Sequence, residues 1–322
     1  MTLALSIGIV LAGLYVGANI GANDAANCIG ASVGAGLIRF KVGISLVAAF
    51  AIAGALLQGG AVAKTVGKGI VTVPLSPEAA LAALLCGGLF VTIATFRRIP
   101  VSTSQSIVGA VAGVGVAGDM PMDWTKTLSI AGSWVLCPIL TAILSYLLYR
   151  TTLALLSRME KTRGPRIVLT WLVLVSAAYG SYSLGANNLG NAIGPIIALD
   201  NQILDPRMLT VLGALSIALG ALFFGRGVAE TVGRSIIPLD LPGAFAAQTS
   251  AGFGLHLFSM WGVPVSTSQA IVGALLGIGL YRGIKTVSRS KMSEVVIGWI
   301  ATPTCAGAVS FLLFVVIRAA SA

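Results

Sequence analysis

Gly21-Ala-Asn-Asp-Ala-Ala-Asn-Cys-Ile-Gly30 is the stretch on which the fold of this chain depends, because it places an acid and two amides inside an apolar run. A variant of it returns as Gly185-Ala-Asn-Asn-Leu-Gly-Asn-Ala-Ile-Gly194. An ionisable side chain within a membrane span is costly and is by default a candidate for function. The two stretches therefore predict a polar centre inside a membrane protein.

The composition of the chain is that of a membrane protein. Of its 322 residues, 57% are hydrophobic and 9% are charged, against roughly 25% charged in an average soluble domain. Apolar runs recur to the C-terminus, which predicts a multi-pass protein of the cell membrane, embedded in the lipid bilayer. The net charge of +10 lies in short loops, and the preference of basic loops for the cytoplasm explains it better than nucleic-acid binding does. The four cysteines stand alone, without the spacing of a disulfide framework or zinc site, so no cofactor is expected.

The predicted fold is an all-α integral membrane protein with about 10–12 transmembrane segments, some of them broken or re-entrant. Apolar segments lie at residues 3–20, 21–36, 42–63, 78–96, 100–117 and 128–150, and then at 167–184, 186–199, 208–228, 241–261, 265–281 and 293–317. Segments 21–36, 100–117 and 186–199 are shorter than the roughly 20 residues of a full span, which favours half-helices or re-entrant pieces there.

The two sets of six segments are one unit repeated. Gly21 pairs with Gly185 at an offset of 185 − 21 = 164, and Val101 pairs with Val265 at the same offset, 265 − 101 = 164. Residues 101–113 match residues 265–277 at 10 of 13 positions, including the run Ser-Thr-Ser-Gln. The predicted organisation is a first repeat at 1–150, a basic linker at 151–166 and a second repeat at 167–322.

The loop charges predict that the two repeats have inverted topology. The loop after the third segment carries Arg97 and Arg98 in the first half and uncharged residues in the second. The loop after the fifth segment shows the reverse, with Asp119 and Asp123 in the first half and several basic residues in the second. Because basic loops stay in the cytoplasm, we expect equivalent loops on opposite sides, the linker 151–166 in the cytoplasm and both termini outside.

Asp24 is the strongest signal for function. Together with Asn23 and Asn27, and with Gly21 and Gly30 permitting unwound backbone, it can offer carboxylate, amide and carbonyl oxygens to a hard cation such as Na+. Alternatively Asp24 carries a proton, because burial disfavours the charged carboxylate. A third interpretation is a buried acid that caps a broken helix and binds nothing.

The two Pro-Val-Ser-Thr-Ser-Gln runs, at 100–105 and 264–269, are typical of helix starts. Proline suits the approach to a helix, and Ser or Thr caps its first N–H groups. The N–H groups at a helix N-terminus bind anions with the help of the helix dipole. Two such starts that converge would suit a tetrahedral oxyanion, although ordinary capping is the alternative.

Three further side chains have weaker claims. Glu230 and Lys64 break the apolar pattern at repeat-related positions, and either pair across the molecule, line a pathway or reach to water from helix ends. His256 is the single histidine, and a packing role is favoured over a proton relay.

At these residues the sequence resembles the inorganic phosphate transporter (PiT) family, whose members are sodium- or proton-coupled phosphate symporters with a duplicated Gly-Ala-Asn-Asp-x-x-Asn-Ala signature. The resemblance implies phosphate contacts from Ser102, Thr103, Ser104, Ser266, Thr267 and Ser268. It implies coupling-cation ligands at Asp24, Asn27, Asn188, Asn191, Gln105 and Gln269, with Asn23, Asn187 and Glu230 as secondary candidates. It also implies an inverted repeat with extracellular termini.

The sequence departs from the family pattern at two places. Asn188 stands where the second signature usually has Asp, which removes a carboxylate and puts one of two symmetric cation sites in doubt. Lys64 stands where an acid is often found before Thr65.

The resulting hypothesis is a secondary transporter, and not an enzyme, that imports inorganic phosphate with Na+ by alternating access around a midplane site. A sulfate permease on the same scaffold, coupled to Na+ or H+, is the nearest alternative, because the two oxyanions share size and shape. An anion channel is a further alternative. A membrane enzyme is disfavoured, because no cluster of His, Cys or carboxylates offers a nucleophile with its base. The sequence is compatible with a homo-oligomer without specifying one.

Overall fold

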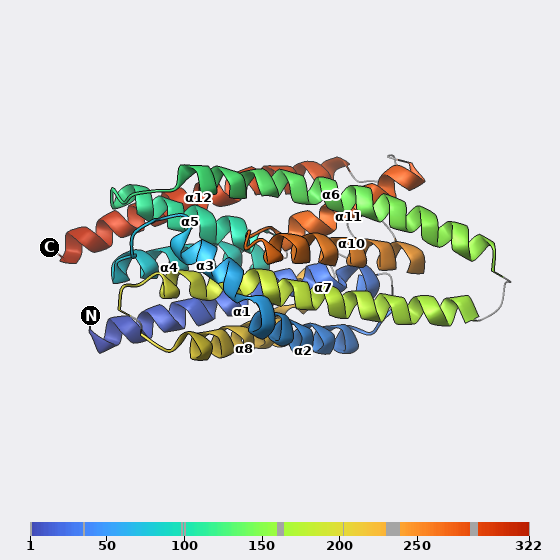
Figure 1. Cartoon of the computed structure of the whole chain (residues 1–322), viewed down its shortest axis with the longest axis horizontal. Coiled ribbons are helices and arrows are strands. Elements are labelled where there is room, and N and C mark those ends of the chain that lie inside the picture. The colour runs from blue at the N-terminus through green and yellow to red at the C-terminus, as the bar shows by residue number, and fades with distance from the viewer. Residues whose placement is uncertain are drawn as a thin grey trace.

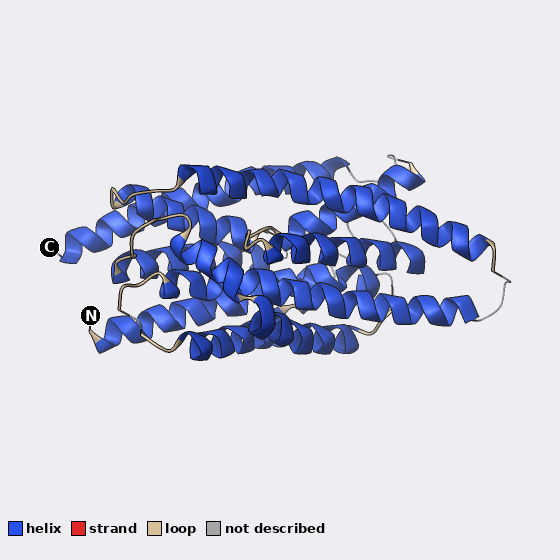
Figure 2. Cartoon of the chain, viewed as in Figure 1, coloured by secondary structure: helices blue, strands red, loops and turns tan. Residues whose placement is uncertain are grey.

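The computed structural model describes residues 2–34, 36–97, 99, 101–159, 164–201, 203–229, 239–283 and 289–321, and these are almost entirely helical (Figure 2). Their helices are α1 (Leu3–Gly34), α2 (Phe40–Gln58), α3 (Gly60–Lys68), α4 (Pro77–Phe96), α5 (Thr103–Ala117), α6 (Trp124–Ser157), α7 (Gly164–Ile197), α8 (Pro206–Phe224), α10 (Leu241–Met260), α11 (Thr267–Arg282) and α12 (Arg289–Ser321). The predicted all-α class is confirmed.

Seven of the described helices are long and apolar enough to cross a membrane, namely α1, α2, α4, α6, α7, α8 and the part of α12 from Val296 to Ala319. The helices run along the long axis of the molecule (Figure 1). Both chain ends lie at one end of the bundle, and the end of α6 and the start of α7 lie at the other. Because α6 continues to Ser157 and α7 begins at Gly164, much of the predicted linker 151–166 is helical.

The two stretches that carry the amides are not broken. Residues 21–30 lie inside α1, which has 32 residues, and residues 185–194 lie inside α7, which has 34. The prediction of separate half-helices at 21–36 and 186–199 is therefore wrong. The predicted short segment at 100–117 is confirmed, because α5 has only 15 residues.

The glycines of these stretches allow helices to approach closely. A Cβ atom on Gly21 would overlap the backbone of Ile217 in α8, and one on Gly185 would overlap the backbone of Ala51 in α2. Small residues at a helix crossing let backbones pack in contact, which is how membrane helices commonly associate. The glycines thus serve packing where unwinding was expected.

The halves of the chain interlock. α1 packs against α8 and α2 against α7, while α5 packs against α12 and α6 against α11. Each of these pairs joins a helix that begins in the first half of the chain to one that begins in the second half. The two repeats are therefore units of sequence that share one helical bundle and its core.

The connection between α4 and α5 reaches the middle of α1. The side chain of Asn23 donates to the Ile99 carbonyl at 3.1 Å and accepts from the Val101 N–H at 3.1 Å. These bonds tie the connection to α1, although Phe96, Arg97 and Ile99 themselves are exposed.

We predict that Gly185→Ala lowers the thermal stability of the purified protein, because the added Cβ would push α2 away from α7. Overpacking of this kind typically costs about 1–3 kcal/mol. Gly132→Ala is the matched control, since the space around Gly132 in α6 is open and alanine favours a helix by about 0.5–1 kcal/mol over glycine. Melting followed by size-exclusion fluorescence should show a lower transition for the first variant only. Equal transitions would contradict the close packing.

Candidate functional site

The predicted site residues gather where the middles of α1 and α7 meet the starts of α5 and α11. All of them are buried, with at most 3% of each residue exposed. They are Asp24, Asn27, Ser102, Thr103, Ser104, Gln105, Asn188, Asn191, Ser266, Thr267, Ser268 and Gln269. A cluster of this many buried polar groups inside an apolar bundle is expensive unless its members bind one another or a ligand.

Asp24 is held by donors from both halves. Its Oδ2 atom accepts a hydrogen bond from the Thr103 hydroxyl at the start of α5. The same atom accepts from the Asn188 Nδ2 of α7 at 3.2 Å. Its other oxygen, Oδ1, is buried without a partner among the described residues. One face of the carboxylate is therefore fixed and the other is available.

Asn188 makes the largest number of hydrogen bonds among the described site residues of the second half. Its Nδ2 also donates to the Thr267 hydroxyl at 2.9 Å, while its Oδ1 accepts from Ser104 at 3.3 Å and from Asn191 at 3.2 Å. Asn191 donates further to Ser104 at 2.9 Å. The Thr103–Asp24 contact and the Asn188–Thr267 contact join repeat-related residues, since 103 − 24 = 79 and 267 − 188 = 79.

The helix starts have the caps that their sequence predicts. The Ser102 hydroxyl accepts from the Gln105 N–H at 3.1 Å, and the Ser266 hydroxyl accepts from the Gln269 N–H at 3.2 Å. Ser104 of α5 donates to the Val265 carbonyl just before α11, at 2.9 Å. The two starts are thus directly joined, and each carries the positive end of a helix dipole.

Several buried polar atoms of the site have no hydrogen-bond partner within the described part of the chain. Besides Asp24 Oδ1, these are Asn27 Oδ1, Asn27 Nδ2, Asn191 Oδ1, Gln105 Oε1 and Gln269 Oε1. Nearly all buried polar groups in proteins are paired, so a concentration of unpaired ones points to a ligand. Five of these six atoms are oxygens, which suits a hard cation or a donor group on an anion.

The secondary candidates have different surroundings. Asn23 and Asn187 each hold the connection that follows a neighbouring helix, α4 and α10 respectively. Asn187 donates to Ser259 at 2.9 Å and to the Val263 carbonyl at 3.3 Å. Asn23 makes the equivalent bonds to Thr95 and Ile99. Glu230 lies outside the described residues. Among the residues that are described, no group of three or more His, Cys, Asp or Glu could hold a metal ion.

Some contributing residues were missed from the sequence. Thr95 and Ser259 hold the two asparagines, and their shared offset of 259 − 95 = 164 is the signal that would have found them. Gln248 donates to the Cys28 carbonyl inside α1 at 2.7 Å. Its repeat partner is Leu84, so no motif marks it. His256 accepts from or donates to the Tyr179 hydroxyl at 3.0 Å, away from the site contacts.

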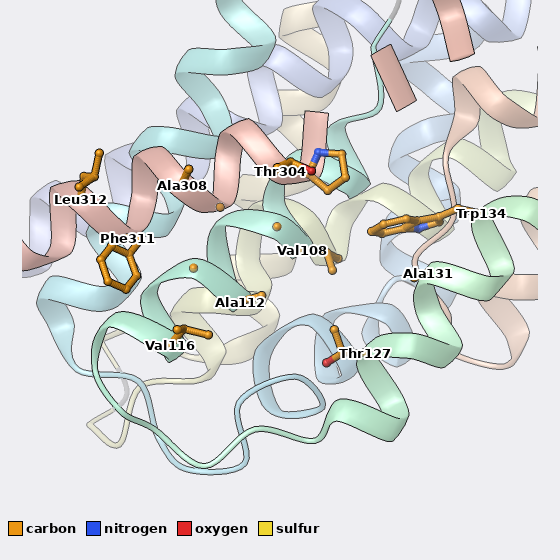
Figure 3. Close-up of a pocket in the computed structure, with 14 residues that line it drawn as sticks. Val108, Ala112, Val116, Thr127, Ala131, Trp134, Thr304, Ala308, Phe311 and Leu312 are labelled. Atoms are coloured by element: carbon orange, nitrogen blue, oxygen red, sulfur yellow. The ribbon is translucent and has the colours of Figure 1, made fainter. Parts of the chain in front are cut away.

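A separate groove of about 650 Å³ lies between α5, α6 and α12 (Figure 3). Apolar side chains such as Val108, Val116, Phe311 and Leu312 line it, with Trp134 at one edge. It contains no charged side chain and none of the predicted site residues. An oxyanion or cation would find no compensating charge there, so we do not assign either to this groove.

The fold and the site together define a multi-pass membrane protein with a buried polar centre, which is the architecture of a transporter. A model of the phosphate transporter family matches residues 20–169 and 156–310. The chain belongs to this family, which confirms the resemblance inferred from its motifs and the prediction of a transporter in place of an enzyme.

Three relatives illustrate the match. A solved structure described as "The sodium-dependent phosphate transporter" has 26% identity and a TM-score of 0.90, covering 98% of this chain and 100% of that one. The "Sulfate permease CysP" of Bacillus subtilis is 31% identical, over 94% of this chain and 86% of its own length. The "Putative phosphate permease MJ0630" of Methanocaldococcus jannaschii is 30% identical, over 80% of this chain and 81% of its own length.

We predict that Asn23→Ala destabilises the protein more than Asn187→Ala does. Asn23 makes three hydrogen bonds, and its removal leaves the buried Val101 N–H without an acceptor. Asn187 makes two, and its Oδ1 is already unpaired. An unsatisfied buried group costs about 1–3 kcal/mol. Melting transitions of the two variants provide the measurement, and a larger loss in Asn187→Ala would contradict the positioning role of Asn23.

Proposed function

We propose that this chain imports inorganic phosphate together with a cation, Na+, by alternating access around the buried centre. The observation that carries this proposal is the meeting of two capped helix starts beside Asp24, surrounded by unpaired oxygens. The names of the relatives support the substrate and the coupling ion.

The anion is held by the starts of α5 and α11. Helix N-termini bind phosphate through free N–H groups and the positive end of the dipole, without requiring Arg or Lys. Thr267 and Ser268 add hydroxyl donors, while Ser102 and Ser266 shape the two starts as caps. Thr103 and Ser104 donate to Asp24 and to the Val265 carbonyl in this structure, so their hydroxyls must turn to donate to an anion. The contact between Ser104 and the Val265 carbonyl supports binding between the starts.

The cation is held on the open face of Asp24. The unpaired Asp24 Oδ1 and Asn27 Oδ1 atoms are oxygen ligands of the kind that hard cations prefer, whereas the Gln105 and Gln269 Oε1 atoms are left for the anion. A cation there neutralises a buried carboxylate and allows an anion nearby, because unlike charges stabilise each other strongly in a low dielectric. This mutual requirement is the physical basis of coupling.

Inverted repeats supply the two access states. α1 begins at the end of the molecule that holds both termini, whereas its repeat partner α7 begins at the opposite end (Figure 1). Equivalent helices that run in opposite directions are what an inverted repeat requires, and exchange of the two repeat conformations opens the centre to either side. The basic linker lies inside the cell and both termini lie outside in this scheme.

We expect Asp24→Asn to abolish cation-driven phosphate uptake while the protein still folds. The amide keeps the shape of the side chain and its contact with Thr103, but it removes the charge that attracts the cation. Labelled phosphate uptake into proteoliposomes under an inward Na+ gradient should fall to the level of empty liposomes. Asp119→Asn is the control, because Asp119 lies in the exposed α5–α6 connection with φ of 51°, a conformation that Asn also adopts. Wild-type uptake by Asp24→Asn would remove the carboxylate from the mechanism.

Sulfate is the second candidate substrate, because the Bacillus subtilis sulfate permease covers most of this chain at 31% identity. The unpaired Gln105 and Gln269 oxygens favour phosphate. Hydrogen phosphate carries a P–OH donor that such an acceptor can bind, whereas sulfate at neutral pH carries none and would face unpaired acceptors.

We therefore predict that unlabelled phosphate suppresses the uptake of labelled phosphate. An equal concentration of sulfate should leave most of the labelled phosphate uptake intact. A site that relies on a ligand hydrogen bond commonly discriminates strongly against an analogue that lacks the group. Competition in proteoliposomes, with and without Na+, measures the preference. If sulfate suppresses phosphate uptake equally and labelled sulfate is itself transported, the substrate of this chain is sulfate.

A further inference from the structure

We infer that Gln248 is a positioning residue for the cation site, because it holds the turn of α1 that carries Asn27. The inference rests on the proposed function, in which Asn27 is a cation ligand, and it adds a residue that lies outside the signature stretches. Gln248 belongs to α10 and is only 2% exposed. It acts through the backbone of α1 and is not itself proposed as a ligand.

The side chain of Gln248 reaches the backbone of the first signature stretch. Its Nε2 atom donates to the Cys28 carbonyl at 2.7 Å, and Cys28 directly follows Asn27 inside α1. The same residue is tied to α7, because the Cys28 thiol donates to the Gly180 carbonyl at 3.5 Å. Cys28 is therefore joined to two helices that begin in the second half of the chain.

The side chain of Asn27 has no hydrogen bond of its own within the described part of the chain. Neither its Oδ1 nor its Nδ2 has a partner there, although Asn27 is only 2% exposed. Asp24, by contrast, is held by Thr103 and Asn188. The backbone of α1 at residues 27 and 28 therefore decides where the Asn27 amide lies. Groups that orient a metal ligand commonly change the affinity for the metal by about 10–100-fold.

An unpaired hydroxyl shows that the bond from Gln248 replaces a local one. Serines inside helices often donate to the carbonyl four residues earlier, as Ser181 does to Ala177 at 2.6 Å. For Ser32 that acceptor is the Cys28 carbonyl, to which Gln248 donates. The Ser32 hydroxyl is fully buried and has no partner among the described residues. The bond between α10 and α1 is thus present although it leaves a buried hydroxyl unpaired.

The repeat offers no equivalent of this bond. Gln248 corresponds to Leu84, since 248 − 84 = 164, and Cys28 corresponds to Ala192, since 192 − 28 = 164. Leucine has no donor, so the side chain at position 84 cannot hold the second signature stretch in this way. The bond is therefore specific to the stretch that carries Asp24.

α10 holds Gln248 from a surface that is itself packed closely against α7. A Cβ atom on Gly252, one turn after Gln248, would lie 3.0 Å from the Cα atom of Gly180. The Ser176 hydroxyl of α7 lies 3.2 Å from Gln248 Oε1 and 2.9 Å from the Val173 carbonyl. Its single hydrogen serves one of them at a time, so the bond to α1 is the one that the position of Gln248 provides without competition.

The test is the Na+ dependence of labelled phosphate uptake by the variant Gln248→Met in proteoliposomes. Methionine is unbranched and similar in length to glutamine, but it cannot donate to the Cys28 carbonyl. The freed carbonyl can accept from the Ser32 hydroxyl, so the variant should fold. We expect the Na+ concentration for half-maximal uptake to rise about tenfold, while the KM for phosphate at saturating Na+ stays at the wild-type value.

Ser145→Ala is the matched control. The fully buried Ser145 hydroxyl lies 2.6 Å from the Ala274 carbonyl and joins α6 to α11, so its loss removes a similar contact between helices other than α1. This variant should melt at a lower temperature and keep the wild-type Na+ dependence. An equal loss of Na+ affinity in Ser145→Ala would show that general loosening causes the effect, which contradicts the inference.

Wild-type Na+ dependence in an active Gln248→Met protein would overturn the inference and leave the proposed cation site intact. Uptake by the wild-type protein that ignores Na+ would overturn the proposed cation and this inference with it, so the two failures are distinguishable. If Gln248→Met does not fold, Gln248→Leu is measured in the same way, since leucine is the residue at the repeat-related position.

Discussion

The carboxylate of Asp24, buried completely inside a helical bundle, is the constraint on which the rest of the structure depends. A charge in such surroundings needs donors and a counter-ion. Thr103 at the start of α5 and Asn188 in the middle of α7 supply the donors. These residues belong to segments far apart in the sequence, so the bundle must bring both halves of the chain to one point. The glycine contacts between α1 and α8 and between α2 and α7 make that convergence possible.

Most of the site could be predicted from the sequence, because its residues are polar where their neighbours are apolar. The two Ser-Thr-Ser-Gln runs identified helix starts whose caps are present at Ser102 and Ser266. The 164-residue offset predicted which residues correspond, and the structure repeats that offset in the contacts of Asn23 and Asn187.

The conformation of the signature stretches could not be predicted in the same way. Gly21 and Gly185 look like helix breakers in isolation, because glycine weakens a helix by roughly 0.5–1 kcal/mol. In the bundle each glycine lies against the backbone of another helix, and packing outweighs that preference. The role of Gln248 was also hidden, since a single glutamine in an apolar helix does not reveal that its partner is the Cys28 carbonyl.

The repeat explains both the symmetry of the centre and its inequality. Two repeat-related helix starts with equivalent serine caps meet in the centre, whereas Asp24 and Asn188 give the halves different charge. The asymmetry involves one side chain, Asn188, which contacts Ser104 and Thr267 of the two helix starts as well as Asp24. Relatives named for phosphate and for sulfate share this scaffold, which agrees with specificity residing in a few side chains.

The central claim is that anion and cation meet where the starts of α5 and α11 adjoin Asp24. An experimental structure of the protein with phosphate and Na+ tests it most directly. We expect tetrahedral density between Thr103–Ser104 and Thr267–Ser268, with a cation in contact with the Asp24 Oδ1 atom. Phosphate bound away from both helix starts, with Asp24 contacting protein alone, would contradict the account.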